Sequence, residues 1–391
     1  MKLEKQHTEQ LIKQFRSLKT KDDLLVLINK VNLLLYGDDF KSLTLKGLNY
    51  YTNPNYSDKR YSSFSIKKKS GGERIINSPV NGLKHILKPL NVILNCIATP
   101  HPKATGFVLG KSIVDNAKQH VGNHYVYNID LKDFFHSFDR NRVKLGFMYP
   151  PFNLSGDLEP LAFLLASLCT HPFEVEGKLK TVLPQGAPTS PTITNILCVK
   201  LDRRLNGLAK RFKVNYSRYA DDITFSSHVN VFKNEVFLKE LNRIIVEDQN
   251  LILNDKKTRL QQTGTRQEVT GLTVNTKVNV NSKYIKQLRM WLYYWEKYGF
   301  NKAESIFLRD YAKDKGHIKT GKPNFQNVLM GKLEYLKMVK GHGDSTYVKL
   351  NARFTRLTRT ESMLEKTLMA WEENGIEKAM EIYKFNNTTM F

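Results

Sequence analysis

Apolar and polar residues alternate with a period of two on both sides of two adjacent carboxylates near the middle of the chain. The stretch from Val214 to Ser227 reads VNYSRYADDITFSS. This alternation predicts two β-strands, and the turn-tolerant pair Asp221 and Asp222 predicts a β-hairpin with the carboxylates at its tip. Adjacent like charges repel each other, and a turn does not require two of them. A bound divalent cation would explain the pair.

A second alternating stretch, YVYNIDLKDFFHSF over 125–138, predicts a central strand that ends near Asp130. A carboxylate at the end of a buried strand is costly unless it meets a cation. A further hairpin is predicted over Arg60–Pro79, with its turn at 70–72. Its strands carry cations that could hold a triphosphate, namely Arg74 and one of Lys67, Lys68 and Lys69.

Helical spacing of apolar residues marks much of the remaining chain, so the pattern as a whole predicts an α+β fold. Helices are predicted from Glu4 to Tyr36, from Lys84 to Ala98 with an interruption at Pro89, over Val231–Glu247, and through most of the chain after Ser282. Two interpretations of the N-terminal helices stay open. They form either a nucleic-acid-binding extension or a cap packed on the domain that follows.

Charge indicates the class of partner. The 391 residues contain 61 Lys and Arg against 37 Asp and Glu, a formal net charge of +24, together with 18 Tyr and 21 Phe. Cations that neutralise phosphates and aromatic rings that stack on bases favour nucleic acid as the partner. The three widely spaced cysteines, the polar N-terminus and the absence of a long apolar run predict a cytoplasmic protein without a membrane segment.

Five strings in order between about Ile66 and Val280 resemble the motifs of reverse transcriptases. They are the cationic hairpin, Asp130 with an aromatic five residues later, LPQGAPTSP at 183–191, YADD at 219–222, and Asn254-x-x-Lys257-Thr258. The resemblance implies a right-hand polymerase architecture with fingers, palm and helical thumb. It implies an N-terminal helical extension at 1–50, fingers and palm at 51–275, and a thumb with a C-terminal extension at 276–391.

The same resemblance implies a nucleotidyl-transfer site that uses deoxynucleoside triphosphates and two Mg²⁺ ions. Phe135 would exclude a ribose 2′-hydroxyl, Gly186 would allow close backbone approach to the nucleotide, and Lys257 could protonate the departing pyrophosphate. The implied catalytic residues are Asp130, Asp221 and Asp222, which with Leu131 form the implied metal site. The implied nucleotide contacts are Lys67, Arg74, Phe135, Gln185, Gly186 and Lys257.

Two further strings, Asn116-Ala-Lys-Gln-His120 and Val269-Thr270-Gly271, resemble signatures of the retron type of reverse transcriptase. The resemblance implies a structured noncoding RNA as template and primer, a single-stranded DNA product, and a role in antiphage defence with an effector protein. Asn116 and His120 are four residues apart and would share a face of a helix, so they could also form only a local hydrogen bond. The implied RNA-binding residues are Asn116, His120, Val269, Thr270, Gly271, Lys283, Lys286 and Arg289.

Three alternatives stay open. The first is another bacterial defence-associated reverse transcriptase with a different template or priming mode, and the second is an enzyme like those of group II introns. The third is a non-catalytic RNA-binding scaffold on a polymerase fold. The scaffold would require the loss of a catalytic carboxylate, whereas all three are present.

Overall fold

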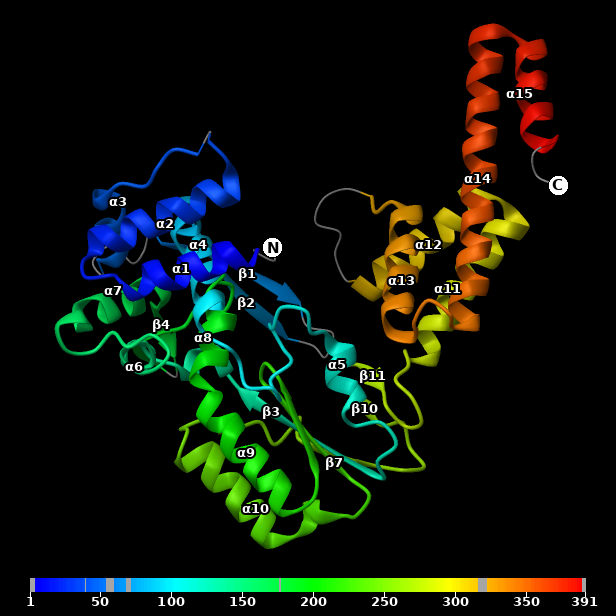
Figure 1. The fold of residues 1–391 in the computed structure, drawn as a ribbon. Helices are drawn as coiled ribbons and strands as arrows, with labels where there is room; N and C mark the ends of the chain where they lie inside the picture. Colours follow the sequence, from blue (N-terminus) through cyan, green and yellow to red (C-terminus); the bar gives the residue numbers. More distant parts are fainter. Residues whose placement is uncertain are drawn as a thin grey trace. The chain divides into compact units, whose positions relative to one another are not determined.

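The structure, a computed structural model, describes residues 4–38, 40–53, 60–67, 72–175, 177–315 and 322–388 (Figure 1). The chain divides into two compact units. The first contains Met1–Thr270 and Val274–Thr276, and the second contains Gly271–Thr273 and Lys277–Phe391. Among the described residues, none of the helices combines the length and the apolar character needed to span a lipid bilayer.

A five-stranded antiparallel sheet forms the centre of the first unit. The strands β6, β7, β3 and β8 follow one another in that order, and β9 also pairs with β3. The predicted hairpin over 214–227 and the predicted central strand are therefore both confirmed, and they are direct neighbours. The bounds are β3 (Tyr125–Lys132), β6 (Asn215–Tyr219), β7 (Asp222–Ser227), β8 (Ile252–Leu253) and β9 (Arg259–Gln262).

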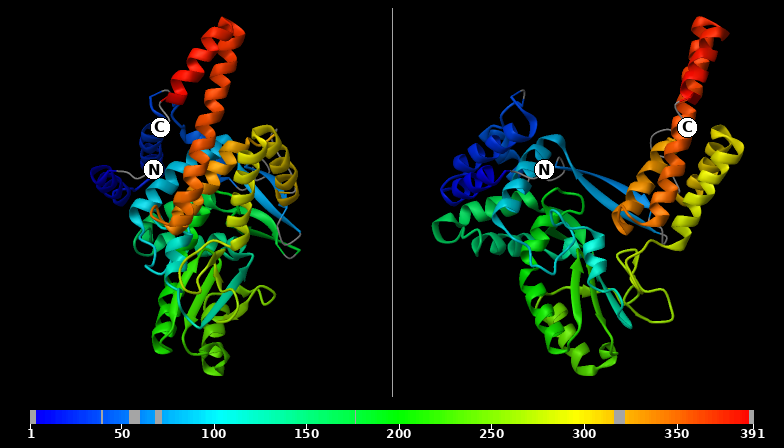
Figure 2. Two further views of the ribbon diagram at one scale, coloured as in Figure 1. Left: turned by 90° about the vertical axis from the view of Figure 1, so that its right-hand side faces the viewer. Right: turned by 45° about the vertical axis from the view of Figure 1, so that its right-hand side comes forward.

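The alternation in β6 and β7 gives this sheet an apolar and a polar face. Tyr216 and Phe225 project toward helices α9 (Val199–Arg211) and α10 (Glu235–Asn242), where the rings of Phe225 and Phe237 lie 5.5 Å apart. These helices run alongside the sheet in every view (Figures 1 and 2). Residues at the intervening positions point to the opposite face, which carries hydroxyl, amide and carboxylate groups.

The N-terminal helices share the hydrophobic core of the first unit. Leu11, Phe15 and Leu24 are buried in one cluster with residues of α4 and of the central sheet. The predicted helix is broken in two, since Thr20 caps a new helix in a capping box with Asp23. This packing favours the cap interpretation. The bounds are α1 (Lys5–Arg16), α2 (Lys21–Tyr36), α3 (Leu45–Thr52), α4 (Asn81–Ile97), α6 (Arg140–Met148), α7 (Glu159–Cys169) and α8 (Ser190–Leu197).

The predicted cationic hairpin is present as β1 (Tyr61–Lys67) and β2 (Glu73–Pro79). Lys68, Lys69 and the first two residues of the predicted turn at 70–72 lie outside the described residues. The base of the hairpin is attached to the loop that follows β5 (Lys178–Val182), because the Asn77 backbone N–H donates to the Gln185 carbonyl at 2.8 Å. The partner of β5 is β4 (His171–Val175).

Three helical predictions need correction. Pro89 lies inside α4 without ending it, and the helix expected over Val231–Glu247 is three short pieces: a 3₁₀ turn at Val231–Lys233, then α10, then a π-helical turn at Arg243–Glu247. His120 lies beyond α5 (Ile113–Lys118), so it does not share a helix face with Asn116.

The second unit contains the short strand β11 (Leu272–Thr273), and its other described elements are helices. Trp291 and Trp295 on α11 are buried among aromatic rings that include Phe325, so these tryptophans are core residues. The mixture of helices and antiparallel sheets in the chain confirms the α+β class. The bounds are β10 (Glu268–Val269), β11 (Leu272–Thr273), α11 (Ser282–Tyr298), α12 (Phe300–Lys315), α13 (Phe325–Lys340), α14 (Ser345–Asn374) and α15 (Ile376–Thr388).

Candidate active site

Three carboxylates from distant parts of the sequence meet at one end of the central sheet. Asp130 on β3 is the cross-strand partner of Asp222 on β7, and both are on the polar face because of the two-residue period. Asp221 precedes Asp222 in the turn, where its carbonyl accepts a hydrogen bond from the Leu131 N–H at 3.2 Å. The pairing of β3 with β7 therefore creates the cluster that was predicted from the sequence.

A cavity of about 590 Å³ opens beside these carboxylates. Asp130, Asp133 and Asp221 line it on the sheet side, and Arg74 and Gln185 line it from the β1–β2 hairpin and the loop after β5. Further lining residues are Glu73, Ile75, Phe107, Leu131, Lys132, Phe134, Phe135, His136, Asn254 and Lys257. The cavity thus combines anionic, cationic and aromatic groups.

Asp130 is held by the loop that connects β8 and β9. Asn254 Nδ2 donates to Asp130 Oδ2 at 2.7 Å, and Lys257 Nζ lies 3.0 and 3.1 Å from the two carboxylate oxygens. Since β8 and β9 both pair with β3, the connecting loop has to pass close to the end of β3. The matching Asn-x-x-Lys string is therefore in direct contact with the predicted catalytic carboxylate.

Burial and mutual repulsion raise the pKa of the two turn carboxylates. Burial is the main cause of the raised pKa of Asp221, and the negative charge of Asp130 adds to it. The pKa of Asp222 is raised to about 7 by burial, then by the charges of Asp221 and Asp130. Asp222 keeps exposed surface, so water and salt weaken this repulsion.

The donor set has the chemistry that Mg²⁺ prefers, since carboxylate oxygens are hard ligands and a divalent charge would offset the repulsion that raises these pKa values. In the described part of the chain, however, no group of three His, Cys, Asp or Glu side chains is arranged to hold a metal ion as it stands. The ammonium of Lys257 supplies the positive charge beside Asp130 in this arrangement.

The tip of the β6–β7 hairpin is fixed from the apolar face by a buried ion pair. Arg218 Nε and Nη2 donate to the two carboxylate oxygens of Asp202, each at 2.7 Å, and both side chains are fully buried. Arg218 Nη1 donates to the carbonyl of Ala220, which has φ of 57°. Gly106 packs against this turn so closely that an added Cβ would lie 2.5 Å from the Ala220 nitrogen.

On the polar face, His120 joins the two strands of the hairpin. Its Nε2 lies 2.7 Å from Ser217 Oγ on β6, and its Nδ1 lies 2.8 Å from Ser226 Oγ on β7. Asn116 Oδ1 accepts a hydrogen bond from Ser217 Oγ at 2.7 Å and another from Thr105 Oγ1 at 2.8 Å. Asn116 and His120 are both 0% exposed. The prediction that they contact RNA directly is therefore wrong for this arrangement, because neither side chain reaches the surface.

His120 gives the protein a defined response to acid. Burial lowers the pKa of His120 from 6.5 to about 3, so only the unfolded chain binds this proton between those values. Acidification from pH 6.5 to 4 should therefore favour unfolding. In a His120→Gln variant, the pH dependence of the free energy of unfolding should be shallower by about 1.4 kcal/mol per pH unit. Urea unfolding followed by circular dichroism measures both slopes, and identical slopes would contradict the buried neutral imidazole.

The predicted nucleotide contacts divide into two groups. Arg74, Phe135, Gln185 and Lys257 line the cavity. Lys67 is exposed at the end of β1 opposite Glu73, and it is not one of the cavity's lining residues.

Gly186 has a different close neighbour from the one expected. With φ of 130°, it lies where a Cβ would be 2.5 Å from the Asn77 carbonyl oxygen. The glycine therefore permits close packing against β2, and it does not line the cavity.

The second retron-like string forms a tight turn. Val269 is fully buried, and Thr270 and Gly271 have φ of 47° and 82°, which is typical of a two-residue hairpin turn. Thr270 Oγ1 donates to the Ile113 carbonyl at 3.3 Å, at the start of α5. Burial excludes Val269 as a direct RNA contact in this arrangement. The predicted contacts Lys283, Lys286 and Arg289 are all exposed on α11.

Comparison with known proteins identifies the family. The family described as "Reverse transcriptase (RNA-dependent DNA polymerase)" matches residues 66–276, which is more than half of the chain and includes every residue of the carboxylate cluster. The chain belongs to the reverse transcriptase family. Within this family it resembles curated retron enzymes.

The retron Mx65 and Mx162 reverse transcriptases of Myxococcus xanthus are 37% and 40% identical over 60% and 55% of this chain. The match spans 56% and 47% of their own lengths, so the chain spans about half the length of these relatives. The retron Ec86 reverse transcriptase of Escherichia coli is 32% identical over 60% of this chain and 69% of its own length. These relatives identify this reverse transcriptase as one of the retron type.

Among solved structures, a telomerase from Candida albicans is 10% identical, with a TM-score of 0.40, over 83% of this chain and 69% of its own. A TM-score of this size supports no conclusion about this reverse transcriptase.

Several residues of the site in this reverse transcriptase were not predicted from the sequence. Phe107, Arg218 and Asp202 lie outside the parts of the motifs that were assigned roles, and Asn254 was matched without a role. Arg218 precedes Tyr219 in an alternating strand, where a charged residue at a core-facing position is itself a signal of a buried partner. The sequence offered no comparable signal for Phe107.

Proposed function

We propose that this protein is an RNA-directed DNA polymerase of the retron type that copies part of a bound, structured noncoding RNA into single-stranded DNA. The cross-strand pairing of Asp130 with Asp222, with Asp221 beside them at a cavity that also contains Arg74, Gln185 and Phe135, is the observation that carries the proposal. Polymerisation needs anionic groups next to a cationic pocket large enough for a nucleoside triphosphate.

In the proposed reaction, two Mg²⁺ ions would be held by Asp130, Asp221 and Asp222 together with the carbonyl of Leu131. These ions would supply positive charge to the attacking hydroxyl and to the leaving pyrophosphate. Arg74 faces the same cavity and would hold phosphate oxygens. Asn254 fixes the orientation of Asp130 through its 2.7 Å hydrogen bond. Lys257 is within reach of Asp130 and would donate a proton to the pyrophosphate.

Phe135 should select the sugar. Its ring lines the cavity with its centroid 6.3 Å from that of Phe107, so a smaller side chain leaves room for a 2′-hydroxyl. Phe135→Ala should raise ribonucleotide incorporation relative to deoxyribonucleotide incorporation by about tenfold or more. Competitive primer extension with the two nucleotides measures the ratio. An unchanged ratio would mean that another residue excludes the hydroxyl.

The exposed cations of α11 should provide RNA affinity without sequence choice. Replacing Lys283, Lys286 and Arg289 by Ala should weaken binding to every RNA and reduce the slope of log affinity against log salt by about one unit for each lost phosphate contact. Filter binding at several salt concentrations with two unrelated RNAs measures both effects. Loss on one RNA alone would show that these residues recognise sequence or shape.

The nucleic acid that copurifies with the protein tests the retron assignment. A branched molecule that joins RNA to single-stranded DNA, formed from a 2′-hydroxyl of the RNA, supports the proposal. Unbranched or untemplated DNA would favour another bacterial defence-associated reverse transcriptase. A role in antiphage defence together with an effector protein is also proposed, and phage plating on cells that carry the active protein or its Asp130→Asn variant tests that role.

A further inference from the structure

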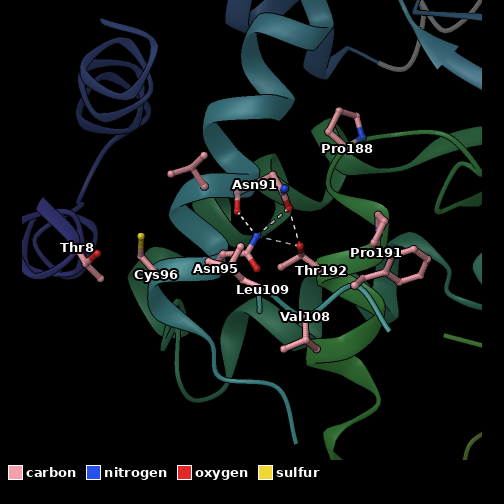
Figure 3. A pocket seen from close by; sticks show the side chains of 11 residues that line it. Thr8, Asn91, Asn95, Cys96, Val108, Leu109, Pro188, Pro191 and Thr192 are labelled. Carbon is pink, nitrogen blue, oxygen red and sulfur yellow. Dashed lines mark hydrogen bonds between the residues drawn. The ribbon is translucent and has the colours of Figure 1, made fainter. Parts of the chain in front are cut away.

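The first unit contains a further cavity of about 590 Å³, bounded by α4 and by the start of α8 (Figure 3). Its polar side chains bond to one another, since Thr192 Oγ1 donates to Asn91 Oδ1 at 2.6 Å. Phe107 lines both this cavity and the one beside the carboxylates, so it is part of the same site. A surface that the proposed reaction does not use lies in the second unit, on α14 and α15.

The last part of α14 and the whole of α15 form a two-helix hairpin. Gly375, with φ of 83°, is the one residue between the two helices, so they run antiparallel to each other. The first part of α14 packs on α11, where the rings of Phe354 and Trp295 lie 6.2 Å apart. The hairpin itself extends away from α11 and α13 in every view (Figures 1 and 2).

Small side chains fill much of the contact between the two helices of the hairpin. Among its described side chains, those that are buried are Met363 and Ala370 on α14 and Ala379 on α15. Two of the three are alanines, so the helices bury little apolar surface against each other. Helices in proteins gain most of their stability from packing an apolar face, and this contact supplies little of it.

The large apolar side chains of the hairpin are exposed instead. Six of them form two stripes with the spacing i, i+4 and i+7, one stripe on each helix, and each is between 43% and 59% exposed. They are Leu364, Leu368 and Trp371 on α14 and Ile376, Met380 and Tyr383 on α15. This spacing is typical of a helix face that packs against another element.

Helix geometry places both stripes on the same side of the hairpin, because each residue turns an α-helix by about 100°. The stripe on α14 follows the buried positions Met363 and Ala370 by one residue, and the stripe on α15 follows Ala379 by one residue. Since the helices run antiparallel, the same offset turns both stripes to the same side. The six side chains therefore form one surface, which we call the apolar face.

Charge distinguishes the apolar face from the surfaces expected to bind nucleic acid. The stretch 361–383 contains six Glu and two Lys, although the whole chain has a net charge of +24. Helical spacing places Glu361, Glu365 and Glu372 along the outer edge of the α14 stripe, where they form an acidic rim. The same spacing places Lys366 and Lys378 on the opposite side of the hairpin.

These charges narrow the choice of occupant. RNA and anionic lipid carry phosphates, which the acidic rim would repel. A second copy of the chain that paired through the same face would bring two acidic rims together. An amphipathic helix with Lys or Arg beside its apolar stripe would match both the apolar face and the rim.

We propose that the apolar face of the α14–α15 hairpin binds a basic amphipathic helix of a partner protein. The apolar side chains of the partner cover Leu368 and Met380, which are in the middle of the two stripes, and its cations lie along the acidic rim. A third helix then packs on two that share only a small contact. The inference goes beyond the proposed function, because nucleotide addition requires no residue of this hairpin.

Trp371 gives a direct readout, because it is 55% exposed whereas the other tryptophans, Trp291 and Trp295, are buried. The probe is a synthetic peptide of about 18 residues, or five helical turns, with leucines along one face, lysines elsewhere and no tryptophan. One control peptide has glutamate in place of lysine, and another has the leucines and lysines in scrambled order. The lysine peptide should shift the emission of Trp371 to shorter wavelengths and bind at least about tenfold more tightly than either control. Equal affinity of the lysine and glutamate peptides would overturn the inference.

Two neighbouring positions test whether one side of the hairpin is responsible. Leu368 belongs to the apolar face, whereas Met369 is 59% exposed and points away from that face. Leu368→Gln should weaken binding of the lysine peptide by about tenfold, and Met369→Gln should leave the affinity close to that of the wild type. Both side chains are exposed, so neither substitution should unfold the chain. An equal effect of the two substitutions would contradict the assigned face.

A second neighbouring pair tests the acidic rim. Glu372 is on the rim, and Glu373 is on the opposite side of α14. Glu372→Gln should weaken the lysine peptide by about threefold at low salt, and Glu373→Gln should have little effect. The difference should disappear at high salt, where exposed charges are screened. If Glu372→Gln had no more effect than Glu373→Gln, a basic partner would be the wrong assignment.

Other occupants would give distinct results. A wild-type dimer in sedimentation equilibrium that Leu368→Gln dissociates would assign the apolar face to a second copy of the chain. Phosphatidylcholine vesicles that shift the emission of Trp371 as the lysine peptide does would assign it to a lipid surface. Either result would overturn the inference. None of these measurements depends on DNA synthesis, so they remain decisive even if the proposed function fails.

Discussion

Asp130→Asn is expected to slow DNA synthesis by about a thousandfold or more, as is typical when a group that stabilises transition-state charge is removed. Asn has nearly the shape of Asp, so the strand pairing that places residue 130 opposite Asp222 should persist. The variant loses the negative charge and also the ion pair with Lys257. Single-turnover primer extension measures the rate, and RNA binding should change little because the exposed cations are untouched.

Asp133 supplies a matched control in the same cavity. It also lines the space beside Asp130. It lies in a left-handed conformation with φ of 46°, and its side chain does not cap the 3₁₀ helix Phe134–Ser137. Asn tolerates that conformation well. Asp133→Asn should therefore extend primers at close to the wild-type rate. If Asp130→Asn and Asp133→Asn slowed primer extension equally, the effect would come from the total charge of the cavity and not from a specific role of Asp130.

Arg218→Met should lower the free energy of unfolding by roughly 3–5 kcal/mol, because it leaves the fully buried Asp202 carboxylate without its cation. It also removes the donor to the Ala220 carbonyl at the hairpin tip. Urea unfolding followed by circular dichroism gives the stability, and primer extension should be impaired even where the variant is folded.

The double variant Arg218→Met with Asp202→Leu isolates the buried charge. It should recover much of the lost stability, since a buried ion pair can often be replaced by apolar side chains at little cost. Primer extension should not recover, because the Ala220 carbonyl still lacks its donor. Asp202 also accepts a hydrogen bond from the Tyr216 hydroxyl at 2.7 Å. A single variant within about 1 kcal/mol of the wild type would show that this bond suffices and would contradict the need for a buried cation.

The sequence predicted those parts of the site that depend on local periodicity. Alternation over 214–227 predicted the hairpin, and alternation over 125–138 predicted the strand that ends near Asp130. Only the structure shows that these strands pair. The contact of Lys257 with Asp130 joins residues 127 positions apart, and no local pattern encodes which loop passes over the end of a given strand. The burial of Trp291 and Trp295 has no local signal for a related reason, since it depends on how helices pack.

Asn116 and His120 show a different limit. The resemblance of their string to a retron signature implied that they read RNA, whereas in the structure both join Thr105, Ser217 and Ser226 inside the first unit. Polar side chains that satisfy one another in a core look in the sequence like polar side chains that await a ligand. Only the fold reveals which of the two environments surrounds them.

The β1–β2 hairpin is attached to the loop after β5 at Asn77, and the rest of the hairpin extends from this point like the arm of a lever. There the backbone is joined to Gln185 at 2.8 Å, and the missing side chain of Gly186 leaves just enough room for the contact. Arg74 is on the arm of this lever, three residues from Asn77. Any side chain at position 186 would tilt the arm and shift Arg74 relative to the carboxylates. The size of residue 186 therefore sets the position of Arg74 relative to the carboxylates, although residue 186 does not itself line the cavity.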